Sequence, residues 1–381
     1  MRKLRVLHTS FTYLPELNGV SQVVKNISER LAARGHEVHV ATSHVFNSPV
    51  EESINDVIVH RFGVNKMSTR QVAREVQRYR ELLSSDRWDI VAAHAAACWP
   101  TNILIESLDV VRAKLVFVSH GLSFWKSPGQ EREYQRLGEA LRFFHATTAL
   151  SEQLVEKEFY ERFSLPPPVV IPNGVDLSEF DGPTLGIRRQ WKVGDRPWVV
   201  NVTNHSKAQK GHEYLHQLAR ILTKDGIVVF NIGNGYPVSR YGLGKLGVKG
   251  GCYYECQVRT LLGSGLRLKI GVPRPEICSA LKEADVFVLT SRYEASPITV
   301  LEAMAAGLPW VSFDVGIVRE HEGGYVVRNL DEMVEKIRFL LDHPEERRAL
   351  GKAGQKRVQE RHNWDNIVDQ YEQLYLKLVQ S

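Results

Sequence analysis

The sequence predicts an α/β protein built from two doubly wound, mainly parallel sheets. Short β runs alternate with amphipathic or turn-rich segments from the first residues onward, a pattern typical of parallel-sheet architecture. The alternation pauses at "IPNGVDLSEFDGP" and then restarts. With 381 residues, 43% of them hydrophobic and 24% charged, the chain is long for one core and comfortable for two domains.

The first half begins with a strand and a clear crossover helix. The expected β runs there are LRVLHT, EVHVAT, DIVAAH, KLVFVSH, ATTAL and PVVIP. Gly35 stands where the end of the first helix favours a left-handed residue. The apolar residues that share one face of this helix are Val20, Val23, Val24, Ile27 and Leu31.

The second half repeats the plan with PWVVNVT, GIVVFNI, LRLKI, DVFVLT and PWVSFD. We therefore expect a first domain over residues 1–177 and a second over 178–363. The ligand site should lie in the cleft between them, at the carboxyl ends of strands. The last segment, 364–381, is an amphipathic helix with Ile367, Tyr371, Leu374 and Leu378 in register.

Charge and hydropathy indicate which kinds of macromolecule or membrane the protein is expected to bind. The net charge of +5 is mild, and no dense basic stripe or nucleic-acid motif is present, so no nucleic-acid partner is expected. No run of eighteen apolar residues and no signal peptide is found, which predicts a cytoplasmic protein. Arg70, Arg74 and Arg78 share a helical face that could hold the protein to an anionic inner membrane surface. A solvated charged face explains them equally well.

Two features bear on metals. Cys252 and Cys256 could form half a metal site or a redox pair, but their spacing without a nearby histidine or a second pair gives this reading little support. No Asp-x-Asp pair occurs, which argues against a divalent cation that clamps a diphosphate. No metal ligand and no cofactor is expected.

The stretch "SRYEASPITVLEAMAAGLP" carries the strongest functional signal, two glutamates on either side of a proline. Pro297 favours the first helical position and Ser296 before it is a good N-cap. Glu294 then lies in a loop, and Glu302 in the second turn of the helix.

The backbone amides near Ile298 and Thr299 would point out of this helix N-terminus, which makes an anion site. A phosphate there would have a carboxylate on each side, which suits a nucleotide sugar because carboxylates accept hydrogen bonds from sugar hydroxyls. A plain Ser-Pro helix start with solvated glutamates is the competing interpretation.

Three other stretches fall at strand ends or helix starts. Gly19 in "LPELNGVSQVV" would let backbone amides approach a phosphate. His120 in "SHGLSFWK" ends a strand, where a histidine is as often structural as functional. Lys207 and Lys210 in "NHSKAQKGHEYL" precede a helix, where lysine commonly marks only a solvated surface.

In this order, the segments resemble the retaining glycosyltransferases of the GT-B fold, in the large family 4 of glycogen-synthase-like, mannosyl- and glucosyltransferases. The most specific part is the Glu, seven residues, Glu pattern of "EASPITVLEAMAAGLP", supported by "IPNGVD", "SHG" and "KG". The resemblance implies two Rossmann-like domains facing a cleft, with the acceptor on the first domain, the nucleotide sugar on the second, and the final helix crossing back onto the first.

The resemblance also implies roles for residues of the second domain. Glu302 would hold the ribose hydroxyls, and Glu294 would contact the transferred sugar. The segment from Ser296 through Ile298 and Thr299 would bind phosphate or sugar oxygens.

Further roles follow for the phosphate and the sugar. Lys210 would neutralise the diphosphate, His120 would lie against the sugar near its C6 hydroxyl, and Gly19 would let a first-domain loop close over the phosphates. The family usually has an arginine shortly before the lysine. Here that stretch reads "NVTNHSKAQKG", so His205 or Lys207 would substitute for it.

The implied activity is transfer of a hexose from a nucleotide-diphosphate sugar, as substrate, to a carbohydrate, lipid or small-molecule acceptor of unknown identity. Retention would proceed by front-face attack through an oxocarbenium-like state, with fixed donors stabilising the leaving phosphate. The alternatives are a nucleotide-sugar epimerase or phosphorylase of the same fold, and a catalytically silent scaffold that binds the donor. The glycine-rich segment 233–251 reads as a long loop without a counterpart in the family.

Overall fold

The computed structural model describes residues 2–16, 18–45, 47–64, 69–122, 125, 128–152, 156–206, 209–235 and 250–380, with the side chains of residues 69–71 outside that description. The chain divides into two compact units. Unit 1 comprises Met1–Asn173 with Trp364–Ser381, and unit 2 comprises Gly174–Asn363. The boundaries expected from the sequence were 177/178 and 363/364.

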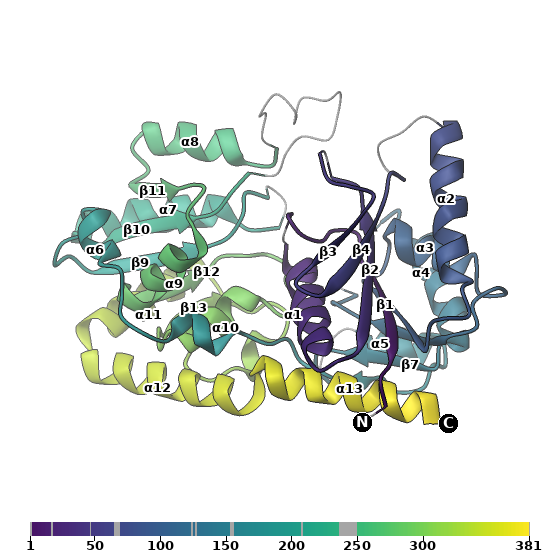
Figure 1. The fold of residues 1–381 in the computed structure, drawn as a ribbon. Coiled ribbons are helices and arrows are strands. Elements are labelled where there is room, and N and C mark those ends of the chain that lie inside the picture. Colours follow the sequence, from purple (N-terminus) through teal and green to yellow (C-terminus); the bar gives the residue numbers. More distant parts are fainter. Residues whose placement is uncertain are drawn as a thin grey trace. The chain divides into compact units, whose positions relative to one another are not determined.

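Unit 1 is built on an eight-stranded sheet with the order β3-β4-β2-β1-β5-β6-β7-β8 (Figure 1). Every neighbouring pair is parallel except the β3–β4 hairpin. The strands are β1 (Arg5–Thr9), β2 (Glu37–Ser43), β3 (Glu51–Ile54), β4 (Val57–Phe62), β5 (Ile90–His94), β6 (Lys114–Val118), β7 (Ala146–Ala149) and β8 (Val169–Val170).

The α-helices of unit 1 cover both faces of this sheet. They are α1 (Gly19–Ala33), α2 (Thr69–Leu83), α3 (Trp99–Ile105), α4 (Glu131–Ala140), α5 (Glu156–Arg162) and α13 (Trp364–Gln380). The first crossover forms as the sequence predicts. Asn18 caps α1 by accepting from the Ser21 amide at 3.0 Å, and Gly35 takes a φ of +90° just past the helix end.

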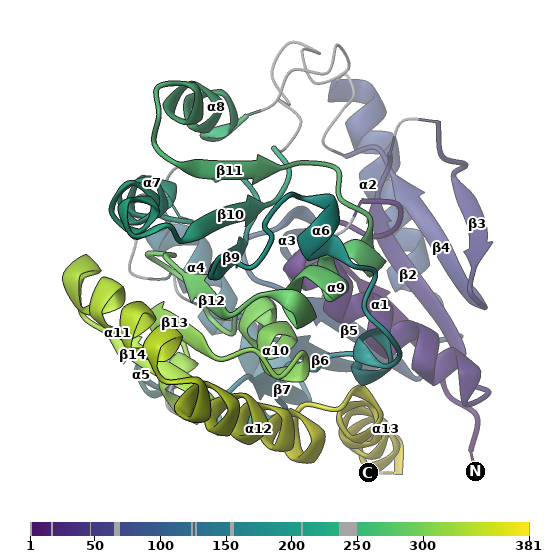
Figure 2. The ribbon, with the colours of Figure 1, turned by 90° about the vertical axis from the view of Figure 1, so that its left-hand side faces the viewer.

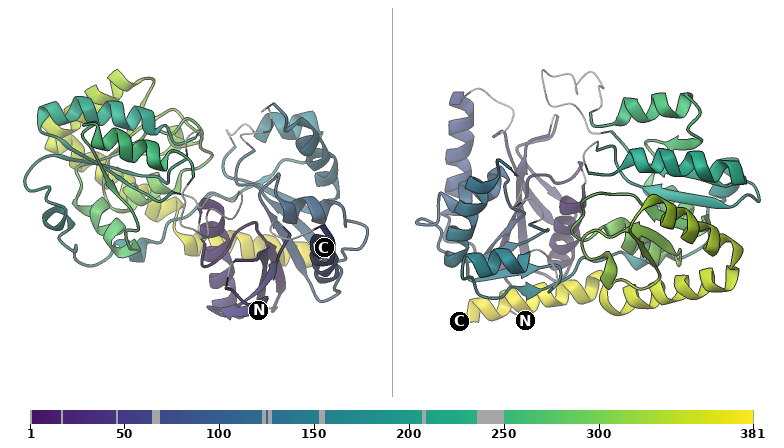
Figure 3. Two further views of the ribbon diagram at one scale, coloured as in Figure 1. Left: turned by 90° about the horizontal axis from the view of Figure 1, so that it is seen from above. Right: turned by 180° about the vertical axis from the view of Figure 1, so that it is seen from behind.

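Helix α13 packs against α1 within unit 1 (Figure 3). Its buried Glu372 accepts from Arg34 Nη1 at 2.7 Å and contacts His36 Nε2 at 2.8 Å. These contacts lower the pKa of Glu372 against the effect of burial, which alone would raise it. A buried charge with two partners fixes how the last helix of the chain sits on the first.

Unit 2 is built on a six-stranded, all-parallel sheet with the order β11-β10-β9-β12-β13-β14 (Figure 2). The strands are β9 (Trp198–Val202), β10 (Val228–Ile232), β11 (Leu266–Lys269), β12 (Val286–Leu289), β13 (Trp310–Phe313) and β14 (Gly324–Val327). From β9 the chain winds outward through β10 and β11, then returns to β12 on the other side. The gap between β9 and β12 is therefore a topological switch point, where ligands bind in such folds.

Helices cover both faces of the unit 2 sheet, with α7 and α11 on one face and α9 and α10 on the other (Figure 2). Successive residues of each strand point to opposite faces of the sheet. Val199 and Val229 belong to the core under α7 and α11, and Trp198 and Phe230 belong to the core under α9 and α10. The helices are α6 (Ile187–Gln190), α7 (His212–Leu222), α8 (Tyr253–Leu261), α9 (Arg274–Glu283), α10 (Ile298–Ala305), α11 (Leu330–Asp342) and α12 (Pro344–Arg361).

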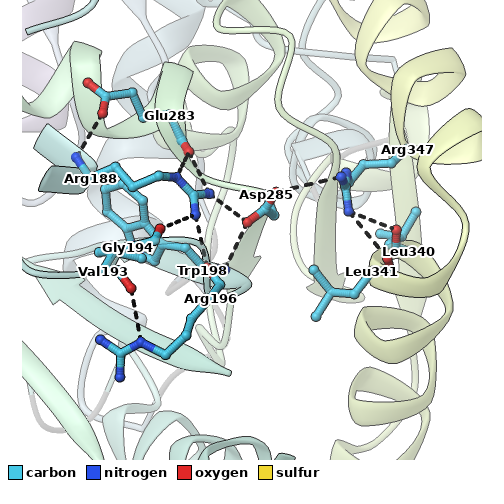
Figure 4. Close-up of polar contacts among 10 residues, drawn as sticks. All are labelled: Arg188, Val193, Gly194, Arg196, Trp198, Glu283, Asp285, Leu340, Leu341 and Arg347. Carbon is cyan, nitrogen blue, oxygen red and sulfur yellow. Dashed lines mark hydrogen bonds and ion pairs between the residues drawn. The ribbon is translucent and has the colours of Figure 1, made fainter. Parts of the chain in front are cut away.

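Asp285 anchors the amino-terminal edge of this sheet (Figure 4). Its carboxylate accepts from the Trp198 amide at 2.9 Å and from Arg188 Nη2 at 2.7 Å, and Arg347 lies 3.6 Å away. One side chain thus ties β9 to β12 at the edge opposite the carboxyl ends. The Asp285 contacts therefore fix the amino-terminal ends of the two strands whose carboxyl ends carry the predicted site.

The α/β prediction with two parallel sheets is confirmed, and every β run named from the sequence forms a strand. The β3–β4 hairpin and the edge strand β14 were missed. Within the described residues, no helix is long and apolar enough to cross a membrane.

Candidate active site

The predicted donor residues of unit 2 gather at the switch point. Strands β9 and β12 pair directly through Val199 with Val286 and Val200 with Phe287. The segment after β9 carries Lys210, and the segment after β12 carries Glu294. Because both strands are parallel, both segments leave the same edge of the sheet.

Lys210 and Glu294 form an ion pair across this edge. Lys210 Nζ donates to Glu294 Oε1 at 2.6 Å, and the two side chains are 18% and 11% exposed. Partial burial weakens solvent screening, so this pair is stronger than an ordinary surface salt bridge. The lysine predicted to meet the diphosphate and the glutamate predicted to meet the sugar thus neutralise each other here.

Backbone contacts hold the two segments together. The Arg292 amide donates to the Gln209 carbonyl at 2.7 Å, and Thr290 Oγ1 donates to the Lys210 carbonyl at 3.3 Å. Gly211 has a φ of +59°, and a Cβ there would lie 2.0 Å from the Thr290 carbonyl oxygen. Only glycine permits this approach, which explains the "KG" dipeptide.

A third segment supports the loop that carries Glu294. The Ile317 amide, in the turn after β13, donates to the Ala295 carbonyl at 3.0 Å. Gly316 has a φ of +53°, and a Cβ there would lie 2.0 Å from that same carbonyl oxygen. The turn therefore packs directly against the backbone on which Glu294 is displayed.

Glu302 points inward from α10 and is only 7% exposed. Its Oε1 accepts from Arg274 Nη1 at 2.7 Å, and Arg274 also donates through Nε to Glu179 at 3.1 Å. Burial raises the pKa of Glu302, while the Arg274 guanidinium opposes the rise. Arg274 and Glu179 were missed by sequence reasoning, because nothing in their local patterns links them to a glutamate in another segment.

The helix start differs by one residue from the prediction. Helix α10 begins at Ile298, and Pro297 is its N-cap with φ −71° and ψ 107°, so the expectation of Ser296 as N-cap and Pro297 as first helical residue was wrong. Proline's fixed φ is compatible with the extended N-cap conformation as well as with the first turn. Ser296 is buried, while Ile298 and Thr299 are partly exposed at the helix start.

His205 lies inside unit 2, beside Cys252 and His212. Its side chain is fully buried, its Nδ1 lies 3.7 Å from Cys252 Sγ, and its ring stacks on His212 with centroids 4.8 Å apart. These surroundings do not favour His205 as the substitute for the missing arginine, and that role stays a prediction. Lys207, the other candidate, lies outside the described residues, as do residues 236–249 of the glycine-rich segment.

Two histidines near Cys252 also overturn the premise that this cysteine pair has no histidine close by. His212 Nδ1 lies 3.1 Å from Cys252 Sγ. Both histidines are distant from the cysteines in sequence, which is why spacing alone did not reveal them.

The predicted residues of unit 1 follow parallel strands of its sheet, Gly19 after β1 and His120 after β6. Gly19 is the first residue of α1, and a Cβ there would meet nothing within 4 Å. The fold therefore does not itself require a glycine at this position. His120 follows β6 and belongs to a chain of histidines that sequence reasoning did not assemble.

In that chain, His8 Nδ1 lies 2.7 Å from His94 Nε2, and His94 Nδ1 lies 3.0 Å from His120 Nε2. Burial lowers the pKa of His8 to about 3 and of His120 to about 4, and lowers that of His94 as well, so all three rings are neutral near pH 7. The signal was present in the sequence, since "LRVLHT" and "DIVAAH" both carry a histidine near the end of a strand.

His8, the first of the three hydrogen-bonded histidines, fixes the tautomers of all three. His8 Nε2 is buried and has no hydrogen-bond partner among the described residues. Burying an N–H without an acceptor costs more than burying a ring nitrogen lone pair without a donor. Nε2 of His8 therefore carries the lone pair, and Nδ1 carries the proton. His8 then donates to His94 and His94 donates to His120 Nε2. His120 consequently keeps its proton on Nδ1, ready to donate.

Two mainly parallel sheets, each with a switch point, and the Lys210–Glu294 pair at the switch point of unit 2 are the arrangement expected of a GT-B glycosyltransferase. Residues 17–179 match the family model described as Glycosyltransferase Family 4, and residues 186–357 match Glycosyl transferases group 1. The chain belongs to this family of retaining glycosyltransferases, which use nucleotide sugars as donors.

Three similar proteins illustrate its breadth. An uncharacterised glycosyltransferase of Methanocaldococcus jannaschii is 26% identical, with 98% of each chain covered. N-acetyl-alpha-D-glucosaminyl L-malate synthase of Bacillus anthracis is 21% identical, again with 98% of each covered. The solved sucrose-phosphate synthase of Thermosynechococcus elongatus has a TM-score of 0.80 at 20% identity, with 99% of each chain covered, and shares the fold.

Proposed function

We propose that this enzyme transfers a hexose with retention of configuration and without a metal ion at the diphosphate. The observation that carries this proposal is the Lys210–Glu294 ion pair, at 2.6 Å, on the carboxyl edge of β9 and β12. A bound donor would replace each partner, because the diphosphate offers Lys210 an anion and the sugar hydroxyls offer Glu294 hydrogen-bond donors.

Glu302 is proposed to hold the ribose of the donor. Arg274 keeps one carboxylate oxygen of Glu302 in place at 2.7 Å and favours its charged form. A carboxylate oriented in this way accepts hydrogen bonds from neighbouring hydroxyls in a fixed geometry. Arg274 thus acts as a positioning residue for Glu302.

The negative charge that develops on the leaving diphosphate is proposed to meet Lys210, the amides at the start of α10 near Ser296, Ile298 and Thr299, and the backbone at Gly19. Such fixed donors stabilise developing charge without reorganisation. Lys207 remains a proposed helper in place of the missing arginine.

His120 is proposed to donate its Nδ1 proton in a hydrogen bond to a hydroxyl of the transferred sugar. Its low pKa keeps the ring neutral, so it orients the sugar without adding a charge beside an oxocarbenium-like state. The acceptor would attack from the face of the departing phosphate, which would take up the acceptor's proton as the glycosidic bond forms.

The acceptor is proposed to bind unit 1 and to be a carbohydrate, a lipid or a small molecule. Peripheral contact with an anionic membrane stays a prediction. Of the three arginines on which it rests, Arg78 is already engaged within unit 1. Arg78 pairs with Glu75 at 2.9 Å and lies over the Phe62 ring at 4.4 Å, whereas Arg74 is exposed. The side chain of Arg70 lies outside the described residues.

A donor panel tests the proposed activity. Purified enzyme is incubated with uridine, guanosine and adenosine diphosphate sugars, with EDTA present, and nucleotide release is followed with and without a mixture of candidate acceptors. We expect release from one donor, stimulated by an acceptor, and a glycosylated product in the mass spectrum. Conversion of the donor to an isomeric nucleotide sugar would instead show an epimerase. Tight donor binding without any release would show a silent scaffold.

A further inference from the structure

Two histidines and two cysteines meet inside unit 2, among residues to which the glycosyl transfer assigns no role. His205, His212, Cys252 and Cys256 each offer one ligand atom, and these atoms all lie within 4.8 Å of one another. Their exposed fractions are 0%, 2%, 5% and 1%. Such a set of imidazole and thiol groups is the usual donor set of a structural zinc site.

Three separate segments converge to build the cluster. His205 follows β9, His212 is the first residue of α7, and Cys252 is the N-cap residue of α8, with Cys256 one turn further on. Gly251 has a φ of +68°, and a Cβ there would lie 2.1 Å from the His205 carbonyl oxygen. The backbone at residue 251 can therefore approach the His205 carbonyl only because residue 251 is a glycine.

Two of the separations between ligand atoms are close to those of tetrahedral coordination. Zn–S bonds of about 2.3 Å and Zn–N bonds of about 2.0 Å place neighbouring sulfur and nitrogen ligands roughly 3.5 Å apart. The observed separations from Cys252 Sγ are 3.1 Å to His212 Nδ1 and 3.7 Å to His205 Nδ1. They bracket the expected value, and all separations among the four ligand atoms are at most 4.8 Å, so a bound metal would draw the side chains together.

A supporting layer orients one of the histidine ligands. His212 Nε2 lies 3.1 Å from Thr203 Oγ1, which donates to Asn201 Oδ1 at 2.6 Å, and Asn231 Nδ2 donates to the same oxygen at 2.8 Å. Metal-bound histidines characteristically have such a partner on the second ring nitrogen. With Nε2 engaged by Thr203, His212 presents Nδ1 to the centre of the cluster.

His205 and the charge balance point the same way. His205 Nδ1 lies 3.7 Å from Cys252 Sγ and His212 Nδ1 lies 3.1 Å from it, so both imidazoles turn a ring nitrogen toward the same thiol. Two thiolates and a divalent cation sum to no net charge, which removes the cost of burying either alone.

We propose that His205, His212, Cys252 and Cys256 bind one Zn²⁺ in a closed, four-coordinate structural site. The two thiols lose their protons to solvent as the metal binds. Four protein ligands leave no open position for water or substrate, so the zinc would have a structural role and would take no part in the glycosyl transfer reaction. Its ligands His205 and His212 flank Lys210 in the chain, and the metal would hold both ends of the segment that presents this lysine.

Metal analysis of the wild-type chain is the first test. The protein is produced with zinc in the medium, passed over a desalting column and measured by plasma mass spectrometry. We expect about one zinc per chain, the stoichiometry of a closed four-ligand site. Replacement of zinc by Co²⁺ should give the absorption of tetrahedral cobalt with thiolate ligands, and this result does not depend on any variant folding.

Variants then assign the ligands. Cys252→Ser with Cys256→Ser should lose the zinc and the cobalt spectrum, whereas Cys278→Ser, which removes a buried thiol on α9, should retain both. Wild-type protein without zinc and without a cobalt spectrum would overturn the proposal. A Cys252–Cys256 disulfide found by mass spectrometry under non-reducing conditions would overturn it in favour of a redox pair.

Discussion

At the scale of single residues, the donor site depends on the charge of Lys210. A charge-assisted hydrogen bond is worth about 1.5–3 kcal/mol, or roughly ten- to hundredfold in rate. Lys210→Ala should therefore lower kcat/KM at least about tenfold, which steady-state nucleotide release would measure. Lys356→Ala, which removes an exposed lysine on α12, should leave kcat/KM unchanged. Full activity of Lys210→Ala would show that the diphosphate is held elsewhere.

His94 should matter for catalysis through His120. His94→Leu removes the donor to His120 Nε2 and lets His120 change its tautomer or rotate. We expect kcat to fall while the donor KM changes little, and ¹⁵N NMR of the wild type to show His120 protonated on Nδ1. His343→Leu, at an exposed site in unit 2, serves as the control. A wild-type His120 protonated on Nε2 would refute the tautomer assignment.

Sequence reasoning placed residues relative to nearby turns and helix starts, and it missed the contacts that they make with distant segments. Glu294 and Glu302 could be found because a proline and a helix start lie between them. The burial of His205 was missed because its neighbour in sequence is a lysine-rich segment, whereas its neighbours in space are Cys252 and His212. Burial, which decides between a phosphate ligand and a core histidine, is not readable from a six-residue motif.

At the scale of elements, the turn after β13 should control the position of the Glu294 loop. Gly316→Ala would bring a Cβ within 2.0 Å of the Ala295 carbonyl oxygen at a φ of +53°. The strain costs about 1–3 kcal/mol, and the displaced loop should raise the donor KM severalfold in the nucleotide-release assay.

Gly226→Ala is the matched control for this turn. Gly226 also has a positive φ, +76°, but a Cβ there would meet nothing within 4 Å. It should lose stability without loss of donor affinity. An equal change of donor KM in both variants would mean that only general destabilisation was observed.

The elements themselves were predictable where burial is continuous. Strands β9, β10 and β12 are short, buried and almost entirely apolar runs, with Asn201 and Asn231 as the exceptions, because helices cover both faces of the sheet. The β3–β4 hairpin was missed because β3, at the sheet edge, alternates exposed and partly buried residues and includes two glutamates. Its pairing with β4 is a tertiary contact that its own composition does not favour.

At the scale of the whole molecule, buried neutral histidines should make the protein sensitive to acid. Burial lowers the pKa of His8 to about 3, of His120 to about 4 and of His321 to about 3, against about 6.5 in the unfolded chain. Below pH 6.5 the unfolded state binds more protons, so the free energy of unfolding falls as the pH falls.

Differential scanning calorimetry should therefore show a Tm that decreases from pH 7 to pH 5. His321→Gln removes one such group, and the ring nitrogens of His321 have no hydrogen-bond partner among the described residues. This variant should show a shallower decrease. A wild-type Tm that is constant over this range would refute the assignment of these rings as neutral and buried.

The two glutamates provide the most direct test of the donor site. Calorimetric titration compares the nucleotide sugar and its free nucleoside diphosphate on wild type, Glu302→Ala and Glu294→Ala. Glu302→Ala should weaken both ligands about tenfold or more, because ribose is common to both. Glu294→Ala should weaken only the nucleotide sugar, since loss of this carboxylate frees Lys210 for the diphosphate. Equal losses for both ligands in both variants would contradict the division of roles on which the proposed function rests.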